Sequence, residues 1–177
     1  MSADASQILE DFREESKILI DKMLALLRKC EKEDNQGQSL EEYGQLADRI
    51  MGAAKTLALN IRSPEHLIHR VSDYTALCKA VGYKGSQIRE NTEFFNVVVA
   101  FLMDATEMLR ALTENLTTSD AKTFDQSLTQ TFLERLKWIS AKFGAQFRDS
   151  LDVHRGKKPP KMDQEGIDTL MKKLGLF

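Results

Sequence analysis

The sequence has few of the residues that interrupt a helix. Prolines number only three and glycines nine in 177 residues. Between these breaks, apolar residues recur three and four positions apart, and no stretch alternates between polar and apolar residues as a half-buried strand does. The chain is long enough to bury a core of its own. We therefore predict an all-α fold, with an antiparallel bundle of four to five helices over residues 6–150.

Long apolar runs, a leader and a concentrated charge are also missing. The longest apolar run, 97–103, is far short of the roughly 20 residues of a membrane-spanning helix. The first residues, MSADASQILEDF, lack the basic and apolar regions of a signal peptide. The net charge is −2, and acids and bases are interspersed along the chain. We expect a cytoplasmic protein that binds neither nucleic acid nor membrane.

Cysteine is scarce as well, since the chain has only Cys30 and Cys78. Each lies within a helical pattern and not in a disulfide framework, which indicates a reducing compartment.

The first helix is expected over 6–31. Its predicted inward stripe is Ile8, Phe12, Leu19, Met23, Leu26 and Cys30.

Start signals place the later helices. Ser39 opens a capping box for a second helix that ends near residue 59. Ser63, followed by a proline, starts a third helix that ends near Gly82. A fourth helix begins near Ser86, and Thr118 or Ser119 caps a fifth. The fifth helix has an apolar stripe with the spacing of antiparallel packing: Phe124, Leu128, Phe132, Leu136, Ile139 and Phe143.

The second helix contains the segment LADRIMGAAKTLAL. A glycine and several alanines in mid-helix cost stability relative to larger residues, so some neighbour should approach the backbone closely there. Tight packing inside the bundle is the simpler explanation.

The same segment resembles the signature helix of histidine phosphotransfer domains, above all those of CheA-type chemotaxis kinases. Their pattern is His-x-x-Lys-Gly-Ser-Ala-x-x-Leu-Gly. The segments DFREESKILIDKMLALL and LIHRVSDYTALCKAVGY are similar to the first and third helices of that family, so the resemblance covers residues 6–117. It implies a four-helix core with a surface that receives a response-regulator receiver domain. The matching positions are Gly52, Ala53, Ala54, Thr56, Leu57, Ala58 and Leu59.

Two departures from the family pattern change the expected chemistry. Asp48 stands where the family has its phosphorylated histidine, and Met51 stands where it has its lysine. An imidazole accepts and passes on the phosphoryl group, so a carboxylate should not serve this relay. We expect a protein that keeps the docking surface without being a histidine phosphorelay protein. Whether a CheA-type kinase also docks, and whether the fifth helix forms a homodimer, stay open.

The C-terminal segment carries a second signature. A linker over 151–161, which includes KKPPK, precedes an amphipathic segment over 162–177. That segment resembles the CheY-binding peptides at the end of the phosphatase CheZ and at the start of the flagellar switch protein FliM. The alternative is a further helix packed back onto the bundle. The matching residues are Gln164, Ile167, Asp168, Leu170, Met171, Leu174, Gly175 and Phe177.

The two resemblances imply the same partner, a CheY-like receiver domain. A flexible linker of about eleven residues has an r.m.s. reach of about 20 Å, which gives the second contact a local concentration near millimolar. The segment would capture the receiver, and the bundle would then contact its phosphorylation site.

A phosphatase reaction needs a group that orients water and, in CheZ, an acidic group one helical turn away. Gln45 and Asp48 are three apart and so share a helix face, although their order is the reverse of that in CheZ. Gln45 would orient the water, and Asp48 would pair with the receiver's lysine. The alternative is that both are ordinary solvated residues.

A weaker catalytic candidate is the pair Glu93 and Asn96. It has the Glu-x-x-Asn spacing of the CheC and CheX phosphatases, but such a short pattern arises easily by chance, and packing at an apolar helix is the simpler explanation. His66 and His69 lack the further ligands of a metal site. We expect no metal or cofactor of the chain's own, and Mg²⁺ would belong to the receiver.

The sequence therefore predicts a chemotaxis-type signalling protein that binds a CheY-like response regulator and promotes its dephosphorylation. A non-catalytic adaptor that binds or sequesters the regulator is the main alternative. A helical interaction protein outside this pathway is a third.

Overall fold

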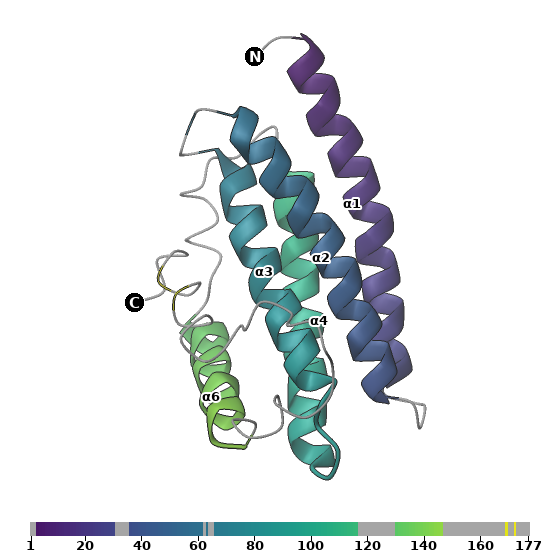
Figure 1. Ribbon diagram of the computed structural model, residues 1–177, viewed down its shortest axis with the longest axis vertical. Coiled ribbons are helices and arrows are strands. Elements are labelled where there is room, and N and C mark those ends of the chain that lie inside the picture. Colours follow the sequence, from purple (N-terminus) through teal and green to yellow (C-terminus); the bar gives the residue numbers. More distant parts are fainter. Residues whose placement is uncertain are drawn as a thin grey trace, which may run out of the picture.

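The computed structural model describes residues 3–30, 36–61, 63, 66–116, 130–146, 169 and 172. These residues form helices and their connections, with no strand (Figure 1). The all-α prediction is confirmed for this part of the chain. Within it, no helix is both long and apolar enough to cross a membrane. The helices are α1 (Ala3–Cys30), α2 (Gln36–Asn60), α3 (Leu67–Gly85), α4 (Thr92–Glu114) and α6 (Gln130–Gln146).

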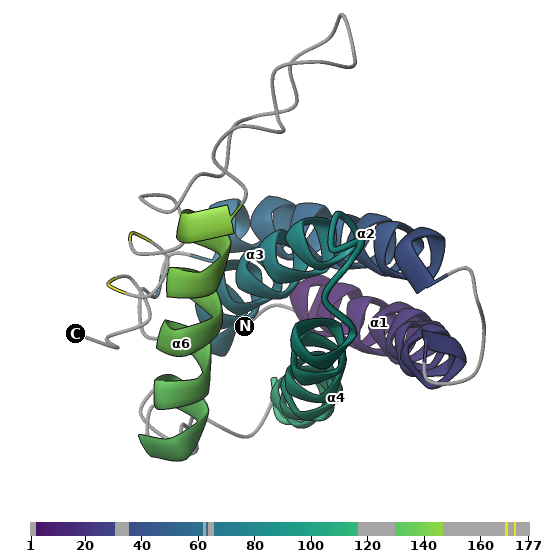
Figure 2. The same cartoon turned by 90° about the horizontal axis from the view of Figure 1, so that it is seen from below.

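Helices α1 to α4 surround a shared core. Helix α1 contacts α2 and α4, and α3 contacts the same two helices, with the most extensive contact between α2 and α3. Consecutive helices run in opposite directions, and Figure 2 shows α6 outside these four. The four helices close around side chains that are almost fully buried, among them Ile20, Leu27, Leu40, Ile50, Leu67, Val71, Val98, Leu102 and Leu109.

The predicted stripe of α1 is confirmed except at its first position. Phe12, Leu19, Met23, Leu26 and Cys30 are buried, but Ile8 is 50% exposed, and its neighbour Leu9 is buried instead.

Buried hydroxyl groups of the core are hydrogen-bonded. The Thr106 hydroxyl donates to the Leu102 carbonyl (2.6 Å), so the Tyr43 hydroxyl donates to Thr106 (2.9 Å). The Tyr74 hydroxyl donates to the Ala105 carbonyl (3.1 Å). Burial raises the pKa of both tyrosines well above the ordinary value. These bonds fix the rings of α2 and α3 against α4.

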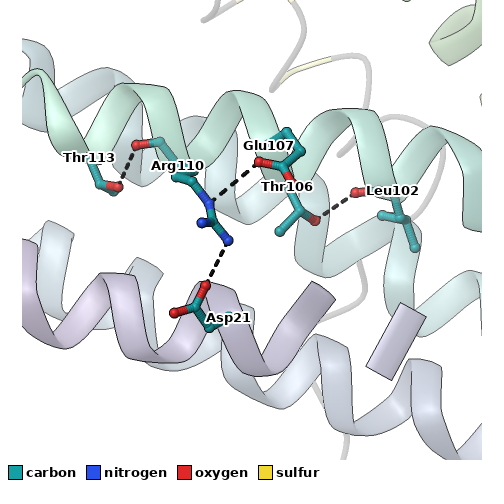
Figure 3. Close-up of polar contacts among 6 residues, drawn as sticks. All are labelled: Asp21, Leu102, Thr106, Glu107, Arg110 and Thr113. Carbon is teal, nitrogen blue, oxygen red and sulfur yellow. Dashed lines mark hydrogen bonds and ion pairs between the residues drawn. The ribbon is translucent and has the colours of Figure 1, made fainter. Parts of the chain in front are cut away.

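An arginine joins α4 to α1. The Arg110 guanidinium donates to Asp21 on α1 (2.7 Å) and lies 3.4 Å from the Glu107 carboxylate one turn away (Figure 3). The Thr113 hydroxyl donates to the Arg110 carbonyl (2.9 Å). These contacts hold the outer edge of the α1–α4 pair.

Helix α6 packs against α3 and α4 through aromatic rings. Phe132 stacks 4.8 Å from Phe101 and 6.4 Å from Tyr74, between centroids. Arg135 donates to Asp104 on α4 (2.5 Å). The predicted stripe is confirmed at its described positions Phe132, Leu136, Ile139 and Phe143, all buried, whereas Phe124 and Leu128 lie outside the described residues.

Two predicted helix starts and one predicted helix end are wrong. Helix α2 begins at Gln36, so Ser39 lies within the helix and does not cap it. Helix α3 is capped by His66, whose Nδ1 accepts the Ile68 N–H (3.2 Å), and not by Ser63. Helix α3 also continues past Gly82 to Gly85, so Ser86 follows it directly.

Helix α4 starts later than expected because the chain must turn first. Ile88, which is buried, lies between the two helices, and Asn91 then caps α4 by accepting the Phe94 N–H (2.9 Å). Tertiary packing of an apolar residue therefore decides which of several capping residues is used. The predicted cap of the fifth helix, Thr118 or Ser119, lies outside the described residues.

Candidate functional site

Helix α2 meets α3 through close backbone approaches at glycines. A Cβ added at Gly44 would lie 3.1 Å from the ring of Tyr83, and one added at Gly82 would lie 2.7 Å from the ring of Tyr43. Each glycine thus makes room for an aromatic ring that belongs to the neighbouring helix. This is the tight packing that the small residues of α2 predict, but it lies nearer the start of the helix than expected.

Gly52 lies on a different side of α2 and has no such neighbour. It is exposed, and among the described residues no atom outside its own helix turn lies within 4 Å of an added Cβ. Its carbonyl accepts the Thr56 hydroxyl (3.0 Å). Packing inside the fold is therefore the wrong explanation for this glycine.

The side chains one turn from Gly52 are polar (Asp48, Arg49, Lys55 and Thr56), and the large exposed apolar side chains lie elsewhere on α1 and α2. We use the term α1–α2 face for the exposed outer sides of these two neighbouring helices, which include Ile8 and Ile18 of α1 and Gln45, Gly52 and Leu59 of α2. Ile8, Ile18 and Leu59 are 50%, 57% and 86% exposed, and they are three of the four large apolar side chains that are exposed in the described part of the chain. Most of the large apolar side chains that are exposed among the described residues thus belong to α1 and α2.

An ion pair shows how α1 and α2 are aligned along their axes. Arg49 of α2 lies 3.3 Å from Glu15 of α1. Because α1 and α2 are antiparallel, Ile8 lies at the Leu59 end of the α1–α2 face and Ile18 at its Gln45 end. Ten residues separate the two isoleucines, about 15 Å along α1, and fourteen separate Gln45 from Leu59, about 21 Å along α2.

Asp48 lies one turn from both Gln45 and Gly52 on α2 and is paired with a lysine of α3. Its Oδ1 is 2.5 Å from Lys79 Nζ, and 48% of its side chain and 19% of that of Lys79 are exposed. Lys79 Nζ also lies 6.0 Å from the centroid of the Tyr83 ring. Burial, and to a lesser degree the charges of Asp48 and Glu41, raises the pKa of Tyr83. Asp48 therefore already has a cationic partner.

The two predicted catalytic residues both lie at the surface. Gln45 is exposed one turn before Asp48, as the spacing predicts. Glu93 and Asn96 are also exposed, in the first turns of α4, while Phe94 and Phe95 between them are buried. Either pair is thus accessible to a partner.

The two histidines lie at the start of α3. His66 caps the helix, and burial, followed by the charge of His69, lowers its pKa. His69 Nε2 is 3.1 Å from the Ser63 carbonyl. No group of three His, Cys, Asp or Glu residues that could hold a metal ion occurs in the described part of the chain. Both imidazoles serve the local structure of this helix start.

The predicted recognition segment is mostly outside the described residues. Thr169 and Lys172 are described, and both are helical and exposed. Three further predictions fall wholly or partly outside the described residues. They are the linker over 151–161, the division of the chain into 6–150 and 162–177, and the predicted binding residues. These residues are Gln164, Ile167, Asp168, Leu170, Met171, Leu174 and Phe177.

Several residues of the surface were not predicted from the sequence. Lys79 and Tyr83 are four apart on one side of α3, which signals a shared direction but not the approach to Asp48. Ile18 and Leu59 are apolar residues outside the buried stripes of their helices, and that mismatch is the signal for an exposed apolar surface.

Comparisons of the chain with protein-family models, with curated proteins and with solved structures give no match. The resemblance to histidine phosphotransfer domains and to CheY-binding peptides therefore stays a prediction from sequence motifs.

Proposed function

We propose that the chain is a chemotaxis-type signalling protein of the cytoplasm that binds a CheY-like receiver domain and promotes the loss of its aspartyl phosphate. The receiver contacts the α1–α2 face, and segment 162–177 provides a second, tethered contact. Gly52 is the observation that carries this proposal.

An exposed glycine in mid-helix is costly without a use. It lowers helix stability by about 1 kcal/mol relative to alanine. Within the described fold, no side chain occupies the space that the missing Cβ leaves at Gly52. A partner that lies directly on the helix backbone would use that space. Ile18 of α1 and Leu59 of α2, which are 57% and 86% exposed, offer apolar contacts to a partner.

The proposed reaction uses the adjoining polar residues. Gln45 orients a water molecule in line with the phosphorus–oxygen bond of the aspartyl phosphate, and Asp48 pairs with the receiver's lysine. The Lys79 ammonium donates to Oδ1 of Asp48, and a carboxylate can accept bonds at both oxygens. Receiver docking therefore requires Asp48 to share its carboxylate or to exchange one lysine for another.

That requirement favours a second candidate, the binding-only adaptor. The Asp48–Lys79 pair occupies the carboxylate within the chain, so a receiver could bind the α1–α2 face without engaging it. Both candidates share receiver binding and differ only in the fate of the phosphate.

Two measurements on one purified receiver test the proposal. Its affinity for the chain and the lifetime of its aspartyl phosphate are measured with the full chain and with Gln45→Ala, Asp48→Ala and Gly52→Gln. We expect Gly52→Gln to weaken binding about tenfold or more, because it fills the backbone approach at the centre of the interface. Gln45→Ala should shorten the phosphate lifetime much less than the unmodified chain does, while binding is retained.

Matched controls separate the alternatives. Glu93→Ala and Asn96→Ala should leave the reaction unchanged, because α4 carries them away from the α1–α2 face. Binding without any change of phosphate lifetime would establish the adaptor. Equal affinity of the unmodified chain and of Gly52→Gln would contradict docking on the α1–α2 face.

A further inference from the structure

Helix α1 carries a continuous stripe of exposed residues on its outer side. The helix packs against α2 and α4 with its other side, and Figure 2 shows it at an edge of the four helices. Ile18 lies near the middle of the stripe and is 57% exposed. Residues three and four apart share one side of a helix. We call this set the α1 stripe, and its members are all exposed: Asp11, Glu14, Ile18, Lys22, Ala25 and Lys29.

Charge is segregated along α1. The first half of the helix, 3–16, has five acidic residues and one basic residue, whereas the second half, 17–30, has four basic residues and one acidic residue. The helix dipole favours this order only within the terminal turns. Asp11, Glu14 and Lys22 lie farther inside the helix, so the dipole does not account for them.

Two other charges of α1 are already paired within the chain. Glu15 lies 3.3 Å from Arg49 of α2, and Asp21 lies 2.7 Å from Arg110 of α4. At 100° per residue, Glu15 and Asp21 are each about 60° from Ile18 around the helix, on opposite sides. The two ion pairs therefore border the α1 stripe, and the stripe itself stays acidic at one end and basic at the other.

Lys55 does not alter this pattern. It is the other basic residue of α2, exposed and seven residues after Asp48, and therefore on the same side of that helix as Asp48. Asp48 is paired with Lys79 of α3. Lys55 thus lies on the α3 side of α2 and away from the α1 stripe.

The α1 stripe is complementary to itself when two helices lie antiparallel. With Ile18 of each copy at a two-fold axis, Glu14 faces the partner's Lys22, because both residues are four positions from Ile18. Asp11 then lies between the partner's Lys22 and the partner's Lys29, within one turn of each. A parallel pair would set acids against acids, so charge selects the antiparallel arrangement and its register.

We infer that two copies of this chain pair through their α1 stripes, antiparallel and with Ile18 at the two-fold axis. Such self-complementary interfaces are the commonest in protein dimers. A single pair of helices is a small interface, so the dimer is expected to be transient. Pairing does not depend on the proposed function. One consequence does: Ile18 also belongs to the α1–α2 face, so a bound receiver and the second copy compete for it.

Charge reversal tests the pairing in the full chain without any receiver. Asp11→Lys with Glu14→Lys makes the α1 stripe basic throughout, and Lys22→Glu with Lys29→Glu makes it acidic throughout. Each variant alone should dimerise about tenfold or more weakly than the unmodified chain in sedimentation experiments, because its stripe repels its own copy. An equimolar mixture of the two should recover the dimer, since each half then meets its opposite. A dimer that both variants keep, or that the mixture does not recover, would overturn the inference.

A thiol at the axis tests the register. Ile18→Cys places two thiols against each other, so mild oxidation should join the copies by a disulfide. Ala25→Cys is the matched control on the same stripe, where antiparallel pairing leaves the thiols about 20 Å apart. Cys30 and Cys78 are each 1% exposed, and burial raises the pKa of the Cys78 thiol to about 12, so the new thiol reacts. Equal cross-linking of both variants, or of Ala25→Cys alone, would contradict the antiparallel pair.

Trp138→Lys separates α1 from α6 as the dimer surface. Trp138 is the large exposed apolar residue of α6, and its replacement should leave sedimentation unchanged. A monomeric Trp138→Lys variant beside dimeric charge-reversed variants would place the interface on α6 and overturn the inference. So would an unmodified chain that stays monomeric at its highest soluble concentration. Because no receiver is present, such failures leave the proposed function standing, whereas a dimer in a chain that binds no receiver contradicts that function alone.

Discussion

The two sides of α2 use glycine in opposite ways. Toward α3, Gly44 and its counterpart Gly82 each give space to an aromatic ring, and the fold fills that space. On the α1–α2 face, Gly52 leaves space that no described neighbour fills. The intrinsic cost to the helix is about the same at each position, roughly 1 kcal/mol relative to alanine. Only on the α3 side does packing within the chain offset it.

The comparison teaches how to separate a structural glycine from a functional one. A glycine that admits a buried ring is explained by the fold, and its replacement should harm stability. A glycine that admits nothing is left without a structural explanation, and its replacement should improve stability while it harms an interaction. The predictions below test that contrast, starting from the largest effect.

Gly82→Ala should destabilise the protein by about 2 kcal/mol, as overpacking of a filled core does. The new Cβ would lie 2.7 Å from the ring of Tyr43, which is fully buried and bonded to Thr106, so the ring cannot move aside. Urea unfolding should show a lower midpoint with an unchanged slope.

Gly44→Ala provides the matched control for this contact. Its Cβ would meet the ring of Tyr83 at 3.1 Å, but Tyr83 is only half-buried and can shift outward. The steric cost of this close approach and the gain in helix propensity should nearly cancel, so the free energy of unfolding should change by no more than about 0.5 kcal/mol. A loss at Gly44 equal to that at Gly82 would mean that the Tyr83 ring is as firmly fixed as the Tyr43 ring.

Gly52→Ala should stabilise the protein by about 0.5–1 kcal/mol, because it gains helix propensity and meets no neighbour. The bond from Thr56 to the Gly52 carbonyl involves only the backbone at residue 52 and should persist. The same variant should bind the receiver more weakly than the unmodified chain. Thermal unfolding and receiver titration of one sample measure both effects, and a gain in both stability and affinity would remove the reason for a glycine here.

The sequence was sufficient to predict helices and their buried sides, because periodicity reports directly on the geometry of a single helix. Phe132, Leu136 and Ile139 are buried as their spacing predicts. Helix starts were harder, since Ser39 and Ser63 have suitable side chains for caps, and packing elsewhere decides which residue is used.

The candidate site shows the same division. That Gln45 and Asp48 share one side of α2 follows from spacing alone. That Lys79 reaches Asp48, and that Gly52 stays uncovered, depends on how α2 is rotated against α3 and α1. Such rotations arise from contacts between distant segments, which periodicity does not encode.

The His66 cap at the start of α3 should make the free energy of unfolding depend on pH. His66 Nδ1 accepts the Ile68 N–H, so this cap requires an unprotonated ring nitrogen. Burial, then the charge of His69, lowers the pKa of His66 from 6.5. The contribution is therefore fully present above pH 6.5 and is lost as the pH falls through the folded-state pKa, by less than about 1 kcal/mol, the usual worth of a cap.

His66→Asn is the variant that isolates this effect. Asparagine caps helices well and does not titrate, so the variant should keep its stability where the unmodified protein loses it. Unfolding midpoints at pH 7.5 and below pH 6 measure the difference. An identical pH dependence in both proteins would assign the effect to other groups.

The smallest effect should come from the Asp48–Lys79 pair, yet it bears most directly on the two proposed functions. Nearly half of the Asp48 side chain is exposed, so a double-mutant cycle with Asp48→Asn and Lys79→Gln should give a coupling of about 0.5 kcal/mol that salt reduces.

A pair so weak can be exchanged for a receiver's lysine at little cost. Lys79→Gln should then shorten the phosphate lifetime of a bound receiver further if Asp48 takes part in the reaction, and should leave it unchanged if the chain is an adaptor. A coupling several times larger would mean that Asp48 is committed to α3 and that catalysis by this carboxylate is the wrong proposal.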